Sequence, residues 1–146
     1  MNLTQRLADV HARIDASSKK ANLPQPTLVV VTKNHPVELV ENLYELGERD
    51  FGENKDQEAS AKSQALNTPE DDYRWHFVGQ LQSNKVRSVM QYASVLHSLD
   101  RQSLLKELAK REAELDVFIQ MNLTDDENRG GVNPGDLLSF AEQVLQ

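Results

Sequence analysis

Apolar residues recur along this chain in two alternating patterns: helical spacing, and the short β-branched runs typical of buried strands. The first helix is predicted over residues 3–21, where an apolar residue recurs every three or four positions until Asn22 and Pro24. Strand-like runs then begin near five residues: Thr27, Arg49, Arg74, Ser94 and Asp116. A helical stretch follows each run, over residues 37–46, 55–66, 85–92, 101–114 and 134–146.

Strands that alternate with helices favour a parallel sheet with the helices packed outside it. Five such units do not close a barrel, because a (β/α)8 TIM barrel needs three more. We therefore expect an α/β fold in which residues 1–146 form a single domain, the N-terminal five of the eight βα units of a TIM barrel. The sheet edges that such a fragment leaves open favour self-association.

Composition narrows the class of protein. The formal net charge of −7 argues against nonspecific nucleic-acid binding, which needs a basic face. No apolar stretch reaches the length of a membrane span, and residues 1–6 lack the apolar segment of a signal peptide. The absence of cysteine excludes disulfides and thiolate metal sites. A cytoplasmic protein with no membrane or nucleic-acid partner is the expectation.

Lys33 closes the first strand-like run, residues 27–33, which lies between Pro26 and Pro36. A lysine at this point would stand at the carboxyl edge of a parallel sheet, where α/β folds place their ligands. An amine partly shielded from water loses some of its pKa and can attack an aldehyde to form an imine. On position alone, a solvated lysine at a strand end is the commoner case, so the rest of the chain has to decide.

Polar side chains also end the other four strands. The candidates for lining a pocket beside Lys33 are Asn54, His76, Ser98 and Asn122. Burying such groups costs free energy unless they find partners, so their gathering near one edge predicts a polar pocket there.

Several of these residues have a structural alternative. Glu53 and Asn54 can cap the helix that follows them, and Asp100 is as good an N-cap as a ligand contact. His76 can be a hydrogen-bonded core histidine. His76 and His97 lack acidic residues at metal-ligand spacing, so no metal site is expected.

Several segments together resemble the pyridoxal phosphate homeostasis protein family. They are residues 30–36 (VVTKNHP), 51–58 (FGENKDQE), 75–85 (WHFVGQLQSNK), 97–100 (HSLD) and 119–122 (IQMN). The resemblance covers nearly the whole chain. It implies an alanine-racemase-like TIM barrel of pyridoxal phosphate fold type III, without the racemase's second domain. It also implies that pyridoxal 5'-phosphate (PLP) is held as an imine on Lys33, with no catalytic turnover. The implied role is to buffer or deliver the vitamin B6 cofactor, which makes apo-enzymes that use PLP candidate partners.

The chain departs from the family pattern in two places. His35 stands where many relatives carry a second lysine, a change that concerns cofactor exchange rather than the imine. The family's Met-Gly-Met-Ser segment and its Arg-x-Gly-Thr phosphate loop would fall after Gln146. We therefore expect the anchors for the phosphate and for the pyridine nitrogen to lie outside these residues.

Three hypotheses follow. The first is a PLP-binding homeostasis protein that holds its cofactor on Lys33. The second is a PLP enzyme of fold type III, such as a racemase or decarboxylase, which needs a second catalytic domain or an acid/base group from a partner. Nothing in these residues offers either. The third is a structural or engineered barrel fragment that binds nothing and covers its open edges by self-association, which a size measurement would reveal.

Overall fold

Five parallel strands form the centre of the structure, a computed structural model that describes residues 1–146. They lie side by side in chain order: β1 (Val30–Val31), β2 (Asp50–Glu53), β3 (Arg74–Phe77), β4 (Ala93–Leu99) and β5 (Asp116–Ile119). A TIM barrel adds its strands in the same way, each parallel to the last. The prediction of five βα units in a partial barrel is therefore confirmed, and β1 and β5 are its two open edges.

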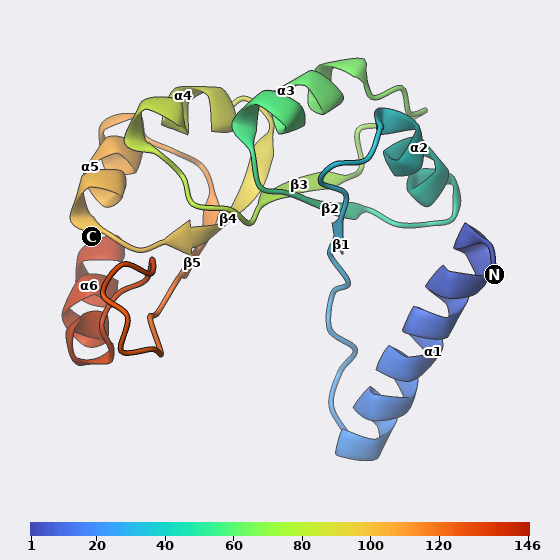
Figure 1. The fold of residues 1–146 in the computed structure, drawn as a ribbon, viewed down its shortest axis with the longest axis horizontal. Coiled ribbons are helices and arrows are strands. Elements are labelled where there is room, and N and C mark those ends of the chain that lie inside the picture. Colours follow the sequence, from blue (N-terminus) through green and yellow to red (C-terminus); the bar gives the residue numbers. More distant parts are fainter.

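Helices follow every strand, and those that connect strands cover the convex side of the curved sheet (Figure 1). In chain order they are α1 (Leu3–Ala21), α2 (Val37–Glu45), α3 (Asp56–Ala65), α4 (Val86–Val89), α5 (Gln102–Lys110) and α6 (Leu137–Val144). Short 3₁₀ turns at Ser83–Lys85 and Pro134–Asp136 lead into α4 and α6. The two terminal helices, α1 and α6, lie at opposite ends of the arc. None of the helices combines the length and apolar character needed to cross a membrane.

Some elements are shorter than predicted. β1 is confined to Val30–Val31 rather than residues 27–33, since only these two residues are in register with β2. α5 ends at Lys110, because Glu112 adopts a left-handed conformation with φ +51° and the Ala113 N–H turns back to the Leu108 carbonyl at 3.2 Å. The helix predicted over residues 85–92 is observed as α4, which spans only Val86–Val89 and is preceded by the 3₁₀ turn at Ser83–Lys85.

The core lies between the sheet and the helices on its convex side. Phe51, Phe77 and Leu96 project from the strands into this layer, and each is at most 2% exposed. Alternate positions of the same strands face the concave side, which no helix covers. There Val31 is 46% exposed and Phe118 is 58% exposed. The helix-facing residues of the strands therefore provide most of the apolar packing, while the concave face keeps exposed apolar side chains.

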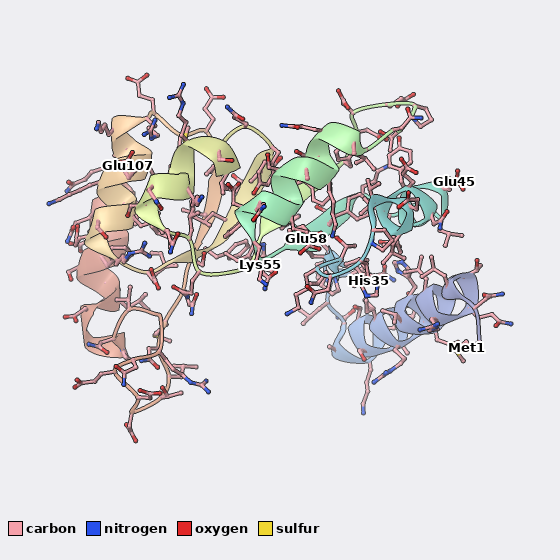
Figure 2. The ribbon with its side chains drawn as sticks, turned by 45° about the horizontal axis from the view of Figure 1, so that its top comes forward. Met1, His35, Glu45, Lys55, Glu58 and Glu107 are labelled. Atoms are coloured by element: carbon pink, nitrogen blue, oxygen red, sulfur yellow. The ribbon has the colours of Figure 1, made fainter.

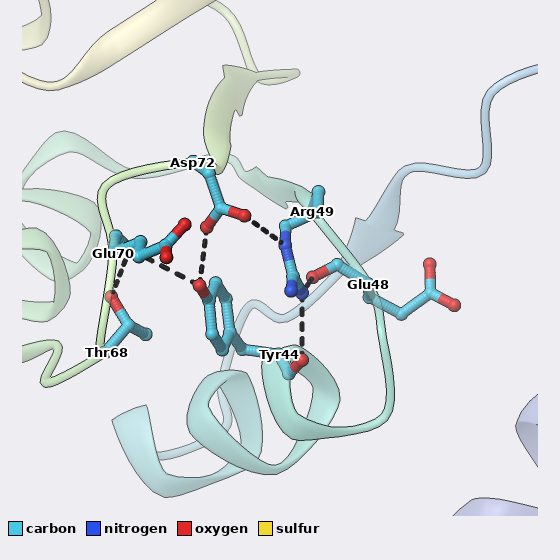
Figure 3. Close-up of polar contacts among 6 residues, drawn as sticks. All are labelled: Tyr44, Glu48, Arg49, Thr68, Glu70 and Asp72. Atoms are coloured by element: carbon cyan, nitrogen blue, oxygen red, sulfur yellow. Dashed lines mark hydrogen bonds and ion pairs between the residues drawn. The ribbon is translucent and has the colours of Figure 1, made fainter.

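A polar cluster ties the amino-terminal ends of β2 and β3 together, at the edge opposite Lys33 (Figure 3). The Tyr44 hydroxyl donates to Asp72 Oδ1 at 2.5 Å, and Arg49 Nε donates to Asp72 Oδ2 at 3.0 Å. The Arg49 guanidinium also stacks over the Tyr44 ring, 3.8 Å from its centroid. The hydrogen bond from Tyr44, followed by that from Arg49, holds the pKa of Asp72 below its usual value. This cluster anchors α2 to the loop before β3, which is a structural role.

Candidate functional site

Lys33 lies in the tight turn that joins β1 to α2, and its side chain is exposed. The parallel ladder continues one residue past β1, because the Thr32 N–H donates to the Gly52 carbonyl at 2.9 Å. Asn34 then takes a left-handed conformation with φ +62°, one that asparagine tolerates better than most residues. The His35 N–H closes the turn on the Thr32 carbonyl at 3.2 Å. The predicted placement of Lys33 at the carboxyl edge of the sheet agrees with this geometry.

Asn54 and Ser98 also lie at carboxyl ends of strands, after β2 and near the end of β4. The Asn54 Oδ1 and the Ser98 Oγ are both buried and have no hydrogen-bond partner in the protein. Gly79 crosses directly over Asn54, since a Cβ at Gly79 would lie 2.4 Å from the Asn54 carbonyl oxygen. Buried polar atoms without partners are rare and costly. A bound ligand could satisfy both, and Glu53 Oε2, at the end of β2, is a third buried atom without a partner. Asn54 does not cap α3, whose N-cap is Lys55 with no side-chain bond.

His76 lies in a row of side chains on the concave face, not at the strand end. It is 5% exposed, with Nε2 2.8 Å from Asp50 Oδ1 and Nδ1 2.8 Å from His97 Nε2. His97 in turn stacks on Phe118 with ring centroids 4.8 Å apart. Burial, and then the charge of His76, lower the pKa of His97. His76 thus has the hydrogen-bonded environment of a core histidine, beside a hollow of about 570 Å³ whose lining includes Arg74 and Val29.

Asn122 is occupied by the loop that follows β5. Its Oδ1 accepts from the Thr124 N–H at 2.9 Å and from the Thr124 hydroxyl at 2.7 Å, and its Nδ2 donates to the Asp126 carbonyl at 3.0 Å. Gly131, at φ +123°, passes so close that a Cβ there would lie 2.4 Å from the Asn122 nitrogen. The side chain of Asn122 therefore organises this loop. Asp100, near the same loop, accepts from the Gly131 N–H at 3.2 Å and does not cap α5, whose N-cap is Arg101.

The sequence analysis missed the residues on the outer side of the Lys33 turn. Lys62 of α3 is 6% exposed and donates to Glu53 Oε1 at 2.6 Å, to Glu58 Oε1 at 2.7 Å and to the Thr32 carbonyl at 2.8 Å. The four-residue spacing of Glu58 and Lys62 is visible in the sequence, but such pairs are usually solvated. The better signal was Glu53, an acidic residue at the carboxyl end of a predicted strand.

Two comparisons with known proteins place the chain. It is 33% identical to the pyridoxal phosphate homeostasis protein of Haemophilus influenzae, a match over 99% of this chain and 63% of that protein. The corresponding protein of Aquifex aeolicus is 36% identical, over 100% of this chain and 66% of the relative. The structure of PipY from Synechococcus elongatus, determined without PLP, superposes with a TM-score of 0.81 at 32% identity, over 98% of this chain and 64% of PipY. The chain belongs to the pyridoxal phosphate homeostasis protein family.

Within this family, a second PipY structure contains bound PLP and matches with a TM-score of 0.76 at 31% identity. A protein of unknown function from Bifidobacterium adolescentis matches with a TM-score of 0.84 but only 23% identity, which supports the fold alone. No protein-family model matches the chain. The chain spans slightly less than two thirds of the length of these family members, which agrees with five units of a larger barrel.

Proposed function

We propose that this chain takes part in vitamin B6 homeostasis by binding PLP, and that Lys33 holds the cofactor as an imine. The observation that carries the proposal is the exposed Lys33 amine at the carboxyl edge of the sheet. PipY, a relative of the same family, has a structure with PLP bound. The orphaned Asn54 Oδ1 and Ser98 Oγ fit a polar ligand at the same edge. When bound, the cofactor supplies an aldehyde that a lysine amine can attack.

The other two candidate residues have more indirect roles in this proposal. His76 shapes the concave wall below the pocket through its bonds to Asp50 and His97. Asn122 shapes the loop after β5, whose glycines bring the backbone close to the sheet edge. We propose that both support the pocket, and that Asn54 and Ser98 contact the ligand.

Covalent PLP is expected on Lys33. Incubation with PLP, reduction with borohydride and peptide mapping should give one labelled peptide, and Lys33→Ala should abolish the label. Lys55 and Lys85 are matched controls, because both are exposed and both follow a strand of the same sheet. A label on either of them with Lys33 unmodified would show that the assignment is wrong.

No amino-acid turnover is expected even with PLP bound. Catalysis needs an acid or base beside the reacting carbon. There is no cysteine, and two of the three tyrosines are bonded on the helix side of the sheet, Tyr44 to Asp72 and Tyr92 to Asp56. The third, Tyr73, packs in the core cluster of Phe51 and Trp75. Racemisation, transamination and decarboxylation should proceed at the rate of free PLP. A faster rate that Lys33→Ala removes would point to a fold-type III enzyme instead.

A further inference from the structure

One buried ammonium group connects to the backbone on both sides of Lys33. Lys62 donates to the Thr32 carbonyl at 2.8 Å, which belongs to the residue before Lys33. It also donates to Glu58 Oε1 at 2.7 Å, and the same oxygen accepts from the Asn34 N–H at 2.6 Å, in the residue after Lys33. Figure 2 shows Glu58 beside the turn that carries His35. The two peptide groups that flank Lys33 are therefore held by one ion cluster.

The third bond of this ammonium goes to Glu53 Oε1 at 2.6 Å, and that oxygen also accepts from the Thr32 hydroxyl at 2.6 Å. Glu53 is 1% exposed and Thr32 is fully buried. All three donors of the ammonium are thus in use. The hydrogen bond from Lys62 outweighs the effect of burial and holds the pKa of Glu58 below its usual value, so Glu58 is ionised at neutral pH.

Ion pairs this deeply buried gain little net stability, because desolvation offsets most of the attraction. A purely stabilising pair would also have no need of a main-chain carbonyl. The cluster is instead directed at one turn, in which Asn34 takes a left-handed conformation. Its hydrogen bonds therefore fix the backbone of that turn at Thr32 and at Asn34.

We infer that Lys62 is a positioning residue for the Lys33 amine. Acting through Thr32 and Glu58, it fixes the turn so that the Lys33 amine is presented at the carboxyl edge of the sheet. Lys62 of α3 thereby orients Lys33 of the turn. We call the contacts of Lys62 with Thr32, Glu53 and Glu58 the clamp. This inference rests on the proposed function for its biological meaning. The contacts of the clamp themselves form without any ligand.

Two variants test the clamp, and Glu107→Ala serves as the matched control. Lys62→Met removes all three bonds. Glu58→Ala removes the Lys62–Glu58 pair and its link to Asn34 but keeps the buried Lys62–Glu53 pair. It therefore tests the same contacts even if Lys62→Met does not fold. Glu107 resembles Glu58, since it pairs with a basic residue, Arg111, one helical turn away at 2.7 Å and its side chain is 22% exposed against 24% for Glu58.

In each variant we would measure the exchange rate of the Asn34 amide, the rate of Lys33 acylation by acetic anhydride, and the apparent PLP affinity from imine absorbance. Near-ultraviolet circular dichroism would confirm the native fold. Glu58→Ala should speed Asn34 exchange and weaken PLP binding, each about tenfold or more, with a changed acylation rate at Lys33. Folded Lys62→Met should do at least as much. Glu107→Ala should leave all three values unchanged.

The outcomes separate the clamp from the proposed function. Folded Glu58→Ala with wild-type amide exchange, acylation and PLP affinity would overturn the positioning role, and the proposed function would stand. A wild-type protein that forms no imine would overturn the proposed function. Amide exchange and acylation, which need no PLP, would then still decide for or against the clamp.

Discussion

Residues 1–146 are expected to bind PLP and pyridoxal with nearly equal affinity, whereas PipY should strongly prefer PLP. In a TIM barrel the phosphate site is formed by the loops after the last two strands, and this structure contains five strands. The amine of Lys33 can engage the aldehyde, but the phosphate would lack its cradle of N–H groups. Hydrogen bonds to a charged group are worth about 1.5–3 kcal/mol each, so two or three of them amount to roughly a hundredfold or more in affinity.

Titration of both proteins with PLP and with pyridoxal, followed by imine absorbance, measures this difference. Pyridoxal is the internal control, because it keeps the aldehyde and loses only the phosphate. Inorganic phosphate should compete with PLP on PipY and have no effect on residues 1–146. A strong preference for PLP in residues 1–146, reversed by phosphate, would mean that these five units contain a phosphate site of their own.

Phe51→Ala should destabilise the protein by about 3–5 kcal/mol, and Phe118→Ala by about 1 kcal/mol or less. Both phenylalanines lie in strands of the same sheet. Phe51 is fully buried against α2 and Trp75 on the convex side, so its removal leaves a cavity. Phe118 is 58% exposed on the concave side and loses only its stack with His97.

Urea unfolding followed by tryptophan fluorescence would give both free energies, with Trp75 as the only tryptophan. Gel filtration of each variant and of the wild type would measure whether the protein self-associates. Self-association through the open concave face or the edges of the sheet would bury Phe118. Equal losses of stability for the two variants would therefore show that the concave face is covered in solution.

The order and type of the elements could be predicted because each βα unit has its own local pattern of apolar and polar residues. The first helix was predicted over residues 3–21 and is observed as Leu3–Ala21, since its pattern ends in the left-handed cap Asn22. The third strand begins at Arg74 as expected. Lengths were less predictable where tertiary pairing decides them. The first strand is short because only Val30 and Val31 pair with β2, and no local pattern encodes how far that pairing extends.

The candidate site was predictable in position more than in detail. The position of Lys33 at the carboxyl edge of the sheet could be predicted from the chain alone, because it follows an apolar run, and its role as the imine lysine stays a prediction. Lys62 was missed because the sequence of an acid–base pair on a helix does not indicate whether the pair is solvated or buried against other segments. Its burial depends on Thr32 and Glu53, which the fold brings together from two other segments. The side chain of Asn122 was likewise assigned by strand periodicity, which stops where the loop begins.

The order of the strands in the sheet has a consequence for how the protein is made. Because β1 to β5 pair only with their neighbours in the chain, every long-range contact of the sheet spans about one βα unit. Short spans of this kind lower the entropy cost of closing each loop and favour fast pairing. Each unit can therefore dock onto the one before it as the chain leaves the ribosome. Growth of the sheet is then vectorial and proceeds from β1 toward β5.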